Sequence, residues 1–172
     1  KKSLSRFGDG EFMWMNGETL DSYQDYSEDF SNELINAFQN KNENLLIGIP
    51  QGIFDSKECN LYAKMHWSII KSDFYVRLEK YVDFNRKYCN ASITRPYIDY
   101  KDYKFSTKAF NNLKRIWDKK NVVIVEGEKT KLGLGNDLFD NTQKIQRIIC
   151  PAKNAYERLE KIIDTIEKNV EK

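Results

Sequence analysis

The chain has 172 residues, of which 40% are hydrophobic and 13% aromatic, enough apolar material to bury the core of one domain. Lysine and arginine number 28 against 26 aspartate and glutamate residues, so the net charge of +2 creates no field typical of a nucleic-acid-binding protein. We therefore expect a single domain over residues 1–172, with no nucleic-acid partner and with its specificity in local sites.

The cysteines and the apolar runs favour a cytoplasmic location. Cys59, Cys89 and Cys150 are widely spaced and lack the spacing of a zinc site, as is typical of reduced thiols. No apolar stretch approaches the roughly 20 residues that cross a bilayer, and the N-terminal segment lacks the apolar centre of a secretory signal. We expect no transmembrane segment, and a cytoplasmic protein that is either free or peripheral at the inner face of the membrane. The abrupt ends favour a fragment of a longer protein.

Three short apolar runs have the composition of strands. They are Leu45–Pro50, Asn121–Glu128 and Arg147–Pro151, each rich in β-branched residues and bounded by turn residues. Runs of this kind are typical of strands that are buried on both faces of a sheet. We therefore expect three strands of a parallel sheet.

Four segments show apolar residues at helical spacing. They are Ser27–Gln39, Glu58–Ile70, Ser106–Asp118 and Asn154–Val170. In the second, the apolar face is expected to comprise Leu61, Tyr62, Met65 and Ile69. Strands that alternate with helices predict an α/β fold, a Rossmann-like, mostly parallel sheet flanked by helices.

Ligands of open parallel sheets bind outside the carboxyl ends of the strands. The residues just after VVIV (122–125) and RIIC (147–150) are therefore candidates for chemistry. They include Glu126, Glu128, the glycine-containing loop after them, and Lys153-Asn154.

The segment Arg6-Phe7-Gly8-Asp9-Gly10-Glu11 is the first candidate site. In an extended segment, Asp9 and Glu11 would project to the same side, and carboxylates so placed suit Mg²⁺ or Mn²⁺. Arg6 would add a forked contact to phosphate. A polar turn explains the same residues equally well, because Gly-Asp-Gly is common in turns.

The second candidate is the loop from Val125 to Asp137, which follows the strongest strand. It combines glycines, cations, a hydroxyl and carboxylates, a composition that suits a phosphate-binding loop. It is no Walker motif, and Gly133-Leu134-Gly135 matches the dinucleotide fingerprint only weakly. A flexible strand-to-helix connection is the alternative.

Three further residues have both a structural and a functional interpretation. Arg95, before Pro96, suits either a phosphate clamp or a surface ion pair. Asn154 suits a helix N-cap by default and a ligand contact in addition. His66, the only histidine, is expected to be structural or a secondary ligand contact.

Five blocks together resemble the bacterial glycosyltransferase family of the GT-D fold, long described as a domain of unknown function. The blocks are RFGDGEF, NASITRPY, IW before VVIVEGE, LGLGNDLFD and RIICPAKNAY, in the order of the family and over nearly the whole chain. The resemblance implies a UDP-sugar donor, typically UDP-glucose, a glycan or glycoprotein acceptor, and a divalent cation, Mn²⁺ or Mg²⁺. It places the metal at Asp9 and Glu11. It also implies that this chain lacks the C-terminal strand region of the family.

The resemblance and the residue patterns together give a predicted set of site residues. The predicted substrate-binding residues are Arg6, Phe7, Gly8, Arg95, Lys131, Gly133, Gly135, Asn136, Asp137 and Asn154. The predicted catalytic residues are Asp9, Glu11 and Glu126, with Glu126 as the acceptor of the proton from the attacking hydroxyl. At position 131 the family often has arginine, and Lys131 keeps the charge without the forked geometry.

Two alternatives stay open from the sequence. Paired carboxylates with a glycine loop also serve nucleotidyl and phosphoryl transfer. A nucleotide-binding module without turnover would carry the same residues.

Overall fold

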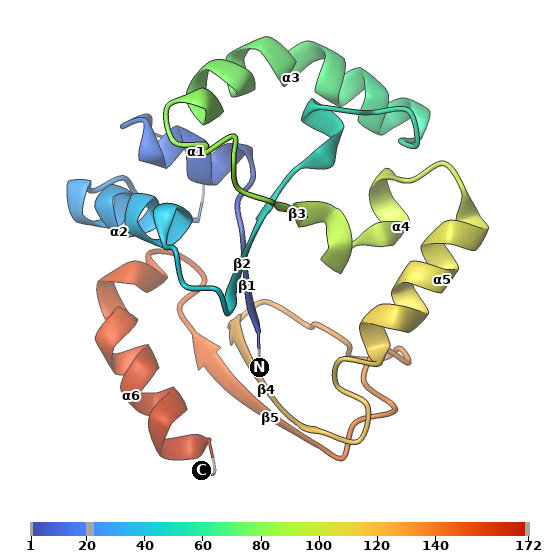
Figure 1. Cartoon of the computed structure of the whole chain (residues 1–172). Coiled ribbons are helices and arrows are strands. Elements are labelled where there is room, and N and C mark those ends of the chain that lie inside the picture. Colours follow the sequence, from blue (N-terminus) through green and yellow to red (C-terminus); the bar gives the residue numbers. More distant parts are fainter. Residues whose placement is uncertain (1, 20–22, 171–172) are drawn as a thin grey trace. The chain divides into compact units, whose positions relative to one another are not determined.

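The computed structural model describes residues 2–19 and 23–170. These residues form two compact units (Figure 1). The first contains residues 2–19 and 26–113, and the second contains 23–25 and 114–170. The single-domain prediction stays a prediction.

The first unit is built on a parallel sheet with the strand order β1-β2-β3. The strands are β1 (Ser3–Arg6), β2 (Leu45–Ile49) and β3 (Cys89–Asn90). Ser3 pairs with Leu45 and Gly48 pairs with Cys89. Because all three strands run in the same direction, the residues that follow them lie at one edge of the sheet.

Helices follow each of these strands. They are α1 (Asp9–Met15), α2 (Glu28–Gln39), α3 (Leu61–Glu79), α4 (Pro96–Asp99) and α5 (Tyr103–Lys114), with 3₁₀ turns η1 (Gln51–Ile53) and η2 (Ala91–Thr94). Side-chain caps begin α2 and α3. Ser27 Oγ accepts a hydrogen bond from the Phe30 amide (3.2 Å), and Asn60 Oδ1 accepts one from the Ala63 amide (2.9 Å).

Aromatic side chains dominate the core of the first unit. Phe12 packs edge-on against Phe38 and Phe74, with ring centroids 5.2 Å apart in both pairs. All three rings are buried, and burial of rings of this size is among the largest contributions to a small core. This packing fixes α1, α2 and α3 around the sheet.

The second unit contains a two-stranded parallel sheet and a helix. Strands β4 (Asn121–Gly127) and β5 (Lys144–Cys150) pair over seven residues each, from Asn121↔Lys144 to Gly127↔Cys150. The turn η3 (Ala155–Arg158) leads into α6 (Leu159–Asn169), which lies beside β5 in Figure 1. A hydrogen bond of 2.9 Å from Gln146 Nε2 to Asn169 Oδ1 joins the strand to this helix.

The predicted α/β class with parallel strands is confirmed, and the predicted strands coincide with β2, β4 and β5. The prediction that β4 and β5 are buried on both faces is wrong for the described chain. Val125 is 43% exposed and Ile149 is 59% exposed. Alternate residues of the two strands therefore face away from their packed side.

The predicted apolar face of the second helix is also wrong. Leu61, Tyr62, Met65 and Ile69 are all more than half exposed, whereas the buried residues of α3 are Ala63, Trp67, Phe74 and Leu78. The helix is longer than expected and has apolar residues on several faces, so periodicity alone did not select the buried one. Within the part of the chain that the structure describes, no helix combines the length and hydropathy needed to cross a bilayer.

Candidate functional site

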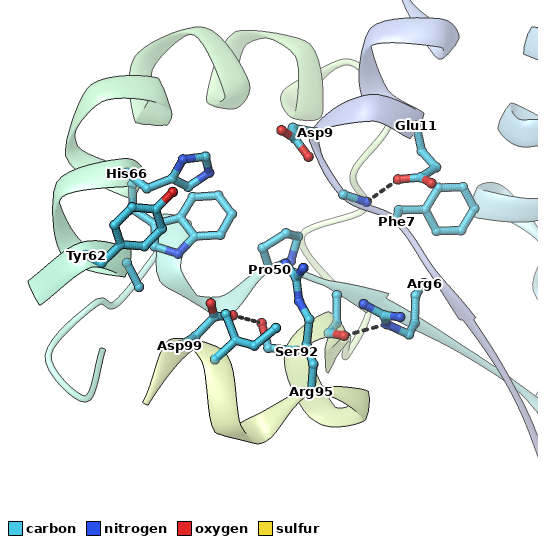
Figure 2. Close-up of a pocket in the computed structure, with 15 residues that line it drawn as sticks. Arg6, Phe7, Asp9, Glu11, Pro50, Tyr62, His66, Ser92, Arg95 and Asp99 are labelled. Carbon is cyan, nitrogen blue, oxygen red and sulfur yellow. Dashed lines mark hydrogen bonds between the residues drawn. The ribbon is translucent and has the colours of Figure 1, made fainter. Parts of the chain in front are cut away.

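A cavity of about 450 Å³ lies where the strands of the first unit end. Its lining comes from the segment after β1, from Pro50 after β2, from η2 and α4 after β3, and from the start of α3 (Figure 2). The charged side chains in the lining are Arg6, Asp9, Glu11, Arg95 and Asp99. The position agrees with the general rule for ligand sites of parallel sheets.

Arg6 is the last residue of β1, and its side chain is fixed at one wall of this cavity. Its Nε donates a hydrogen bond of 2.5 Å to the carbonyl oxygen of Ala91. Burial lowers the pKa of Arg6, the nearby Arg95 charge lowers it further, and Glu11 opposes both effects. The two guanidinium groups repel each other, and an anion that binds between or beside them reduces this repulsion.

Asp9 and Glu11 lie in the first turn of α1, so the expectation of an extended segment is wrong. Residues two apart on a helix do not face the same side. Glu11 Oε2 accepts a hydrogen bond of 2.7 Å from the Gly8 amide and so caps its own helix. Asp9 points into the cavity in Figure 2 and has no hydrogen bond or ion pair with the described residues.

Whether these residues suit a divalent cation depends on the metal ligands that their side chains offer. Among residues 2–19 and 23–170, no group of three histidine, cysteine, aspartate or glutamate side chains converges on one point. Mg²⁺ and similar ions in nucleotide sites are commonly held by one or two carboxylates together with substrate phosphates and water. Asp9, in a cavity that two guanidinium groups also line, fits a cation that arrives with a phosphate, and it does not form a complete cage.

Arg95, between η2 and α4, and Asp99, the last residue of α4, also line the cavity. Ser92 Oγ donates a hydrogen bond of 2.7 Å to Asp99 Oδ2, and Asn90 Oδ1 accepts one of 3.0 Å from the Ser92 amide. The Arg95 guanidinium has no hydrogen bond or ion pair with described residues and is exposed. It is thus a cation without a structural partner at the wall that also holds Arg6.

Phe7 and Gly8 connect β1 to α1 at the base of the cavity. The Phe7 ring is 2% exposed and packs edge-on against Phe38, with centroids 5.0 Å apart. The Phe7 amide donates to the Gly48 carbonyl (2.9 Å), which continues the β1–β2 ladder. Most of the ring therefore belongs to the core.

The cavity also contains residues that were not predicted as site residues. They are Pro50, Tyr62, Ala63, Trp67, Ala91, Ser92, Ile98 and Asp99, together with His66, for which the sequence left a structural role open. Tyr62, Ala63, His66 and Trp67 repeat at helical spacing on α3. The spacing is visible in the sequence, but the sequence does not show which face of this apolar helix borders a cavity.

Glu126 lies in β4 of the second unit and is buried. Its Oε1 forms an ion pair with Arg147 of β5, and its Oε2 accepts a hydrogen bond of 3.4 Å from the Leu132 amide. Arg147 also donates to the Leu132 carbonyl (2.6 Å). The pair therefore anchors the loop after β4, and the role of Glu126 as proton acceptor stays a prediction.

The remaining predicted residues of this loop are mostly exposed. Gly133 and Gly135 have φ of +72° and +77°, values that favour glycine. Asn136 Oδ1 accepts a hydrogen bond of 3.0 Å from the Leu138 amide. Asp137 forms an ion pair with Lys114 (2.8 Å), and this hydrogen bond lowers the pKa of Asp137. Lys131 is exposed and has no ion pair with any described residue.

Asn154 does not cap a helix with its side chain, so that prediction is wrong. It adopts a left-handed conformation (φ 54°) before η3. Its side chain accepts a hydrogen bond from the Asp25 amide (2.9 Å) and donates one to Asp25 Oδ2 (2.7 Å). Asn154 therefore holds residues 23–25 in the second unit.

The predicted site residues thus fall into two groups. The first group lines one cavity of the first unit and consists of Arg6, Phe7, Gly8, Asp9, Glu11 and Arg95. The second group belongs to the other unit and consists of Glu126, Lys131, Gly133, Gly135, Asn136, Asp137 and Asn154.

Comparisons with known proteins agree with this fold. A family model described as "Glycosyltransferase GT-D fold" matches residues 4–172. Glycosyltransferase GlyD of Streptococcus pneumoniae serotype 4 is 35% identical over 173 residues, covering 96% of this chain and 20% of that protein. The probable glycosyl transferase Gly of Streptococcus gordonii is 35% identical over 172 residues, covering 98% of this chain and 25% of that protein.

Solved structures give the same result. A structure described as the highly conserved domain of unknown function 1792 with a distinct glycosyltransferase fold is similar with a TM-score of 0.89 and 34% identity, covering 98% of this chain and 61% of that one. A new glycosyltransferase (DUF1792) from Streptococcus sanguinis is similar with a TM-score of 0.87 and 35% identity, covering 98% of this chain and 63% of that one. The chain therefore spans a quarter or less of its curated relatives and about three fifths of the solved chains. The family match over almost every residue, together with these structural similarities, shows that the chain belongs to the glycosyltransferase family of the GT-D fold.

Proposed function

We propose that this chain is the donor-binding part of a glycosyltransferase. The donor is a UDP-hexose, UDP-glucose in the first instance, and the acceptor is a glycan of a surface glycoprotein or polysaccharide. The observation that carries the proposal is that one cavity is lined by two guanidinium groups, Arg6 and Arg95, and by the Asp9 carboxylate, which has no ion pair with the described residues. The names of the streptococcal relatives support the reaction class.

The diphosphate of the donor suits the arginine wall. Arg6 is oriented by its hydrogen bond to the Ala91 carbonyl, which leaves its terminal N–H groups for phosphate oxygens. Arg95, directly after η2, supplies a second cation, and it has no competing ion pair among the described residues. Both charges stabilise the negative charge that develops on the departing nucleotide.

A divalent cation, Mn²⁺ or Mg²⁺, would be held by Asp9 together with the phosphates and water. Glu11 would contribute its charge from the helix cap, or its second oxygen as a ligand. When bound, the cation would neutralise the leaving diphosphate. The residues of the chain bind and orient the donor for this step.

The proposal is tested by a calorimetric titration with UDP, with and without Mn²⁺, followed by an assay of UDP-[¹⁴C]glucose turnover. We expect UDP to bind, Mn²⁺ to strengthen the binding, and glucose to be released or transferred, in this chain or in a longer protein that contains it. Preference for nucleoside triphosphates over UDP-sugars would instead favour nucleotidyl or phosphoryl transfer. UDP binding without turnover in the longer protein would favour a binding module.

A further inference from the structure

The first turns of α3 form a second wall of the cavity. The proposed donor site does not use this wall. Tyr62 and His66 lie one helical turn apart in this wall, and Figure 2 shows their rings side by side across the cavity from Arg6. Tyr62 is 79% exposed. Neither side chain has a hydrogen bond with the described residues, and His66 contacts the Trp67 ring edge-on.

The two walls differ in chemistry. The wall formed by the end of β1 and by η2 carries the guanidinium groups of Arg6 and Arg95. The α3 wall presents the aromatic rings of Tyr62, His66 and Trp67 and the small side chain of Ala63. A diphosphate is attracted to the first wall, whereas the second suits an uncharged ring, because aromatic faces bind polarised C–H groups.

The aromatic rings that line the cavity differ in their exposure to solvent. Phe7, directly after β1, is 2% exposed, whereas Tyr62 of α3 is open to solvent. Tyr62 is therefore accessible to a second substrate after the diphosphate is held at the arginine wall. A volume of about 450 Å³ lies in the range of roughly 300–1,000 Å³ that is typical of small-molecule sites.

We propose that Tyr62 and His66 form the acceptor subsite, where an uncharged pyranose ring of the acceptor binds. The Tyr62 ring packs against one face of the sugar. A ring nitrogen of His66 accepts a hydrogen bond from a sugar hydroxyl, as a neutral imidazole can. The inference rests on the proposed function, because it assigns the second substrate of that reaction.

The α3 helix provides a matched control for this proposal. Tyr75 lies on the same helix, is 37% exposed, and is absent from the cavity lining. Tyr75→Ala therefore removes the same chemical group from the same helix without altering the cavity. Tyr62→Phe keeps the ring and removes only the hydroxyl.

The experiment measures two ligands separately on the purified chain. UDP binding is followed by calorimetry, and binding of methyl glycosides of glucose, galactose and N-acetylglucosamine by saturation-transfer NMR in the presence of UDP. We expect Tyr62→Ala to weaken glycoside binding by about tenfold, a typical effect of one lost aromatic contact. We expect His66→Ala to weaken it as well, Tyr62→Phe to weaken it less than Tyr62→Ala does, and Tyr75→Ala to match the wild type. UDP binding should change much less than glycoside binding in the Tyr62 and His66 variants.

Several outcomes would overturn the inference. If Tyr62→Ala weakens UDP binding as strongly as glycoside binding, the ring is a platform for the nucleobase. If Tyr62→Ala leaves glycoside binding unchanged, or if the wild type binds none of the glycosides, the α3 wall is not the acceptor subsite. Failure of the wild type to bind UDP would instead contradict the proposed donor function, while glycoside binding that depends on Tyr62 would still support a sugar subsite.

Discussion

The Nε of Arg6 donates a hydrogen bond of 2.5 Å to the carbonyl oxygen of Ala91. This contact joins the end of β1 to the start of η2, two segments 85 residues apart in sequence. The bond fixes the plane of the guanidinium group, so its remaining donors have a defined direction at the cavity wall. A lysine at this position would keep the charge but could not bind the carbonyl and a phosphate in the same plane.

We therefore expect Arg6→Lys to weaken UDP binding by about 10- to 100-fold, since a hydrogen bond to a charged group contributes about 1.5–3 kcal/mol. Calorimetry with UDP measures this change. Arg86→Lys is the matched control, because Arg86 also donates to backbone carbonyls, those of Phe38 and Leu45, but lies outside the cavity. Equal UDP affinity in Arg6→Lys and the wild type would contradict the role of Arg6.

Asp9 is the carboxylate expected to carry the cation dependence. Asp9→Asn keeps the shape of the side chain and removes its charge, so we expect Mn²⁺ to lose most of its strengthening effect on UDP binding. Asp29→Asn is the control, because Asp29 also lies in the first turn of a helix, α2, and is exposed. The two variants lose the same favourable interaction with a helix dipole. If both respond to Mn²⁺ like the wild type, Asp9 is not a ligand.

Elements whose apolar residues follow one dominant pattern could be predicted from the sequence, because that pattern fits only one type of secondary structure. The run Leu45–Ile49 has the length and composition of a buried strand and forms β2. Ser27 precedes a helical pattern and caps α2. In both cases the local signal and the tertiary packing agree.

The predictions that are wrong concern segments with two competing patterns. Around α3, apolar residues occur on several faces, and the core selected the face of Trp67 and Phe74. The Gly-Asp-Gly sequence suits a turn, yet Glu11 caps the amide of Gly8 and a short helix begins at Asp9. The aromatic wall of the cavity follows from the α3 packing, and no short motif in the sequence indicates it.

Gly52 and Trp67 form a contact that leaves no room for a larger residue. A Cβ on Gly52 would lie 2.1 Å from Trp67 Nε1. Since Trp67 lines the cavity, we expect Gly52→Ala to displace the indole and to lower the free energy of unfolding by about 1–3 kcal/mol. Urea denaturation measures the loss. Gly127→Ala serves as the control, because its Cβ would meet no atom closer than 3.5 Å, and equal loss in both variants would contradict the steric argument.

The Glu18–Arg77 ion pair gives the stability a pH dependence. The hydrogen bond from Arg77 is the largest of the effects that lower the pKa of Glu18 in the folded chain. The stabilisation of the folded chain by this ion pair is therefore fully present above the ordinary glutamate pKa. It is lost as the pH falls through the lowered pKa of Glu18. Both side chains are about one third exposed, so we expect less than about 1 kcal/mol. Glu18→Gln should unfold at a lower temperature than the wild type near neutral pH, and the difference should shrink in acid. A difference that is independent of pH would exclude this ion pair as its cause.

Variants of Glu126 can distinguish a structural role of this residue from a catalytic one. Its side chain is 5% exposed, and Arg147, its partner, is 22% exposed. Removal of one member of such a pair leaves an uncompensated charge, so we expect Glu126→Ala to lower the free energy of unfolding by about 3–5 kcal/mol. Leucine at both positions should restore much of the loss, because no charge is then left without a partner. If Glu126 only anchors the loop at Leu132, the double variant should regain UDP-glucose turnover together with stability. If Glu126 accepts the proton of the acceptor hydroxyl, the double variant should be stable and inactive, and the rate of transfer measured beside the denaturation curve distinguishes the two results.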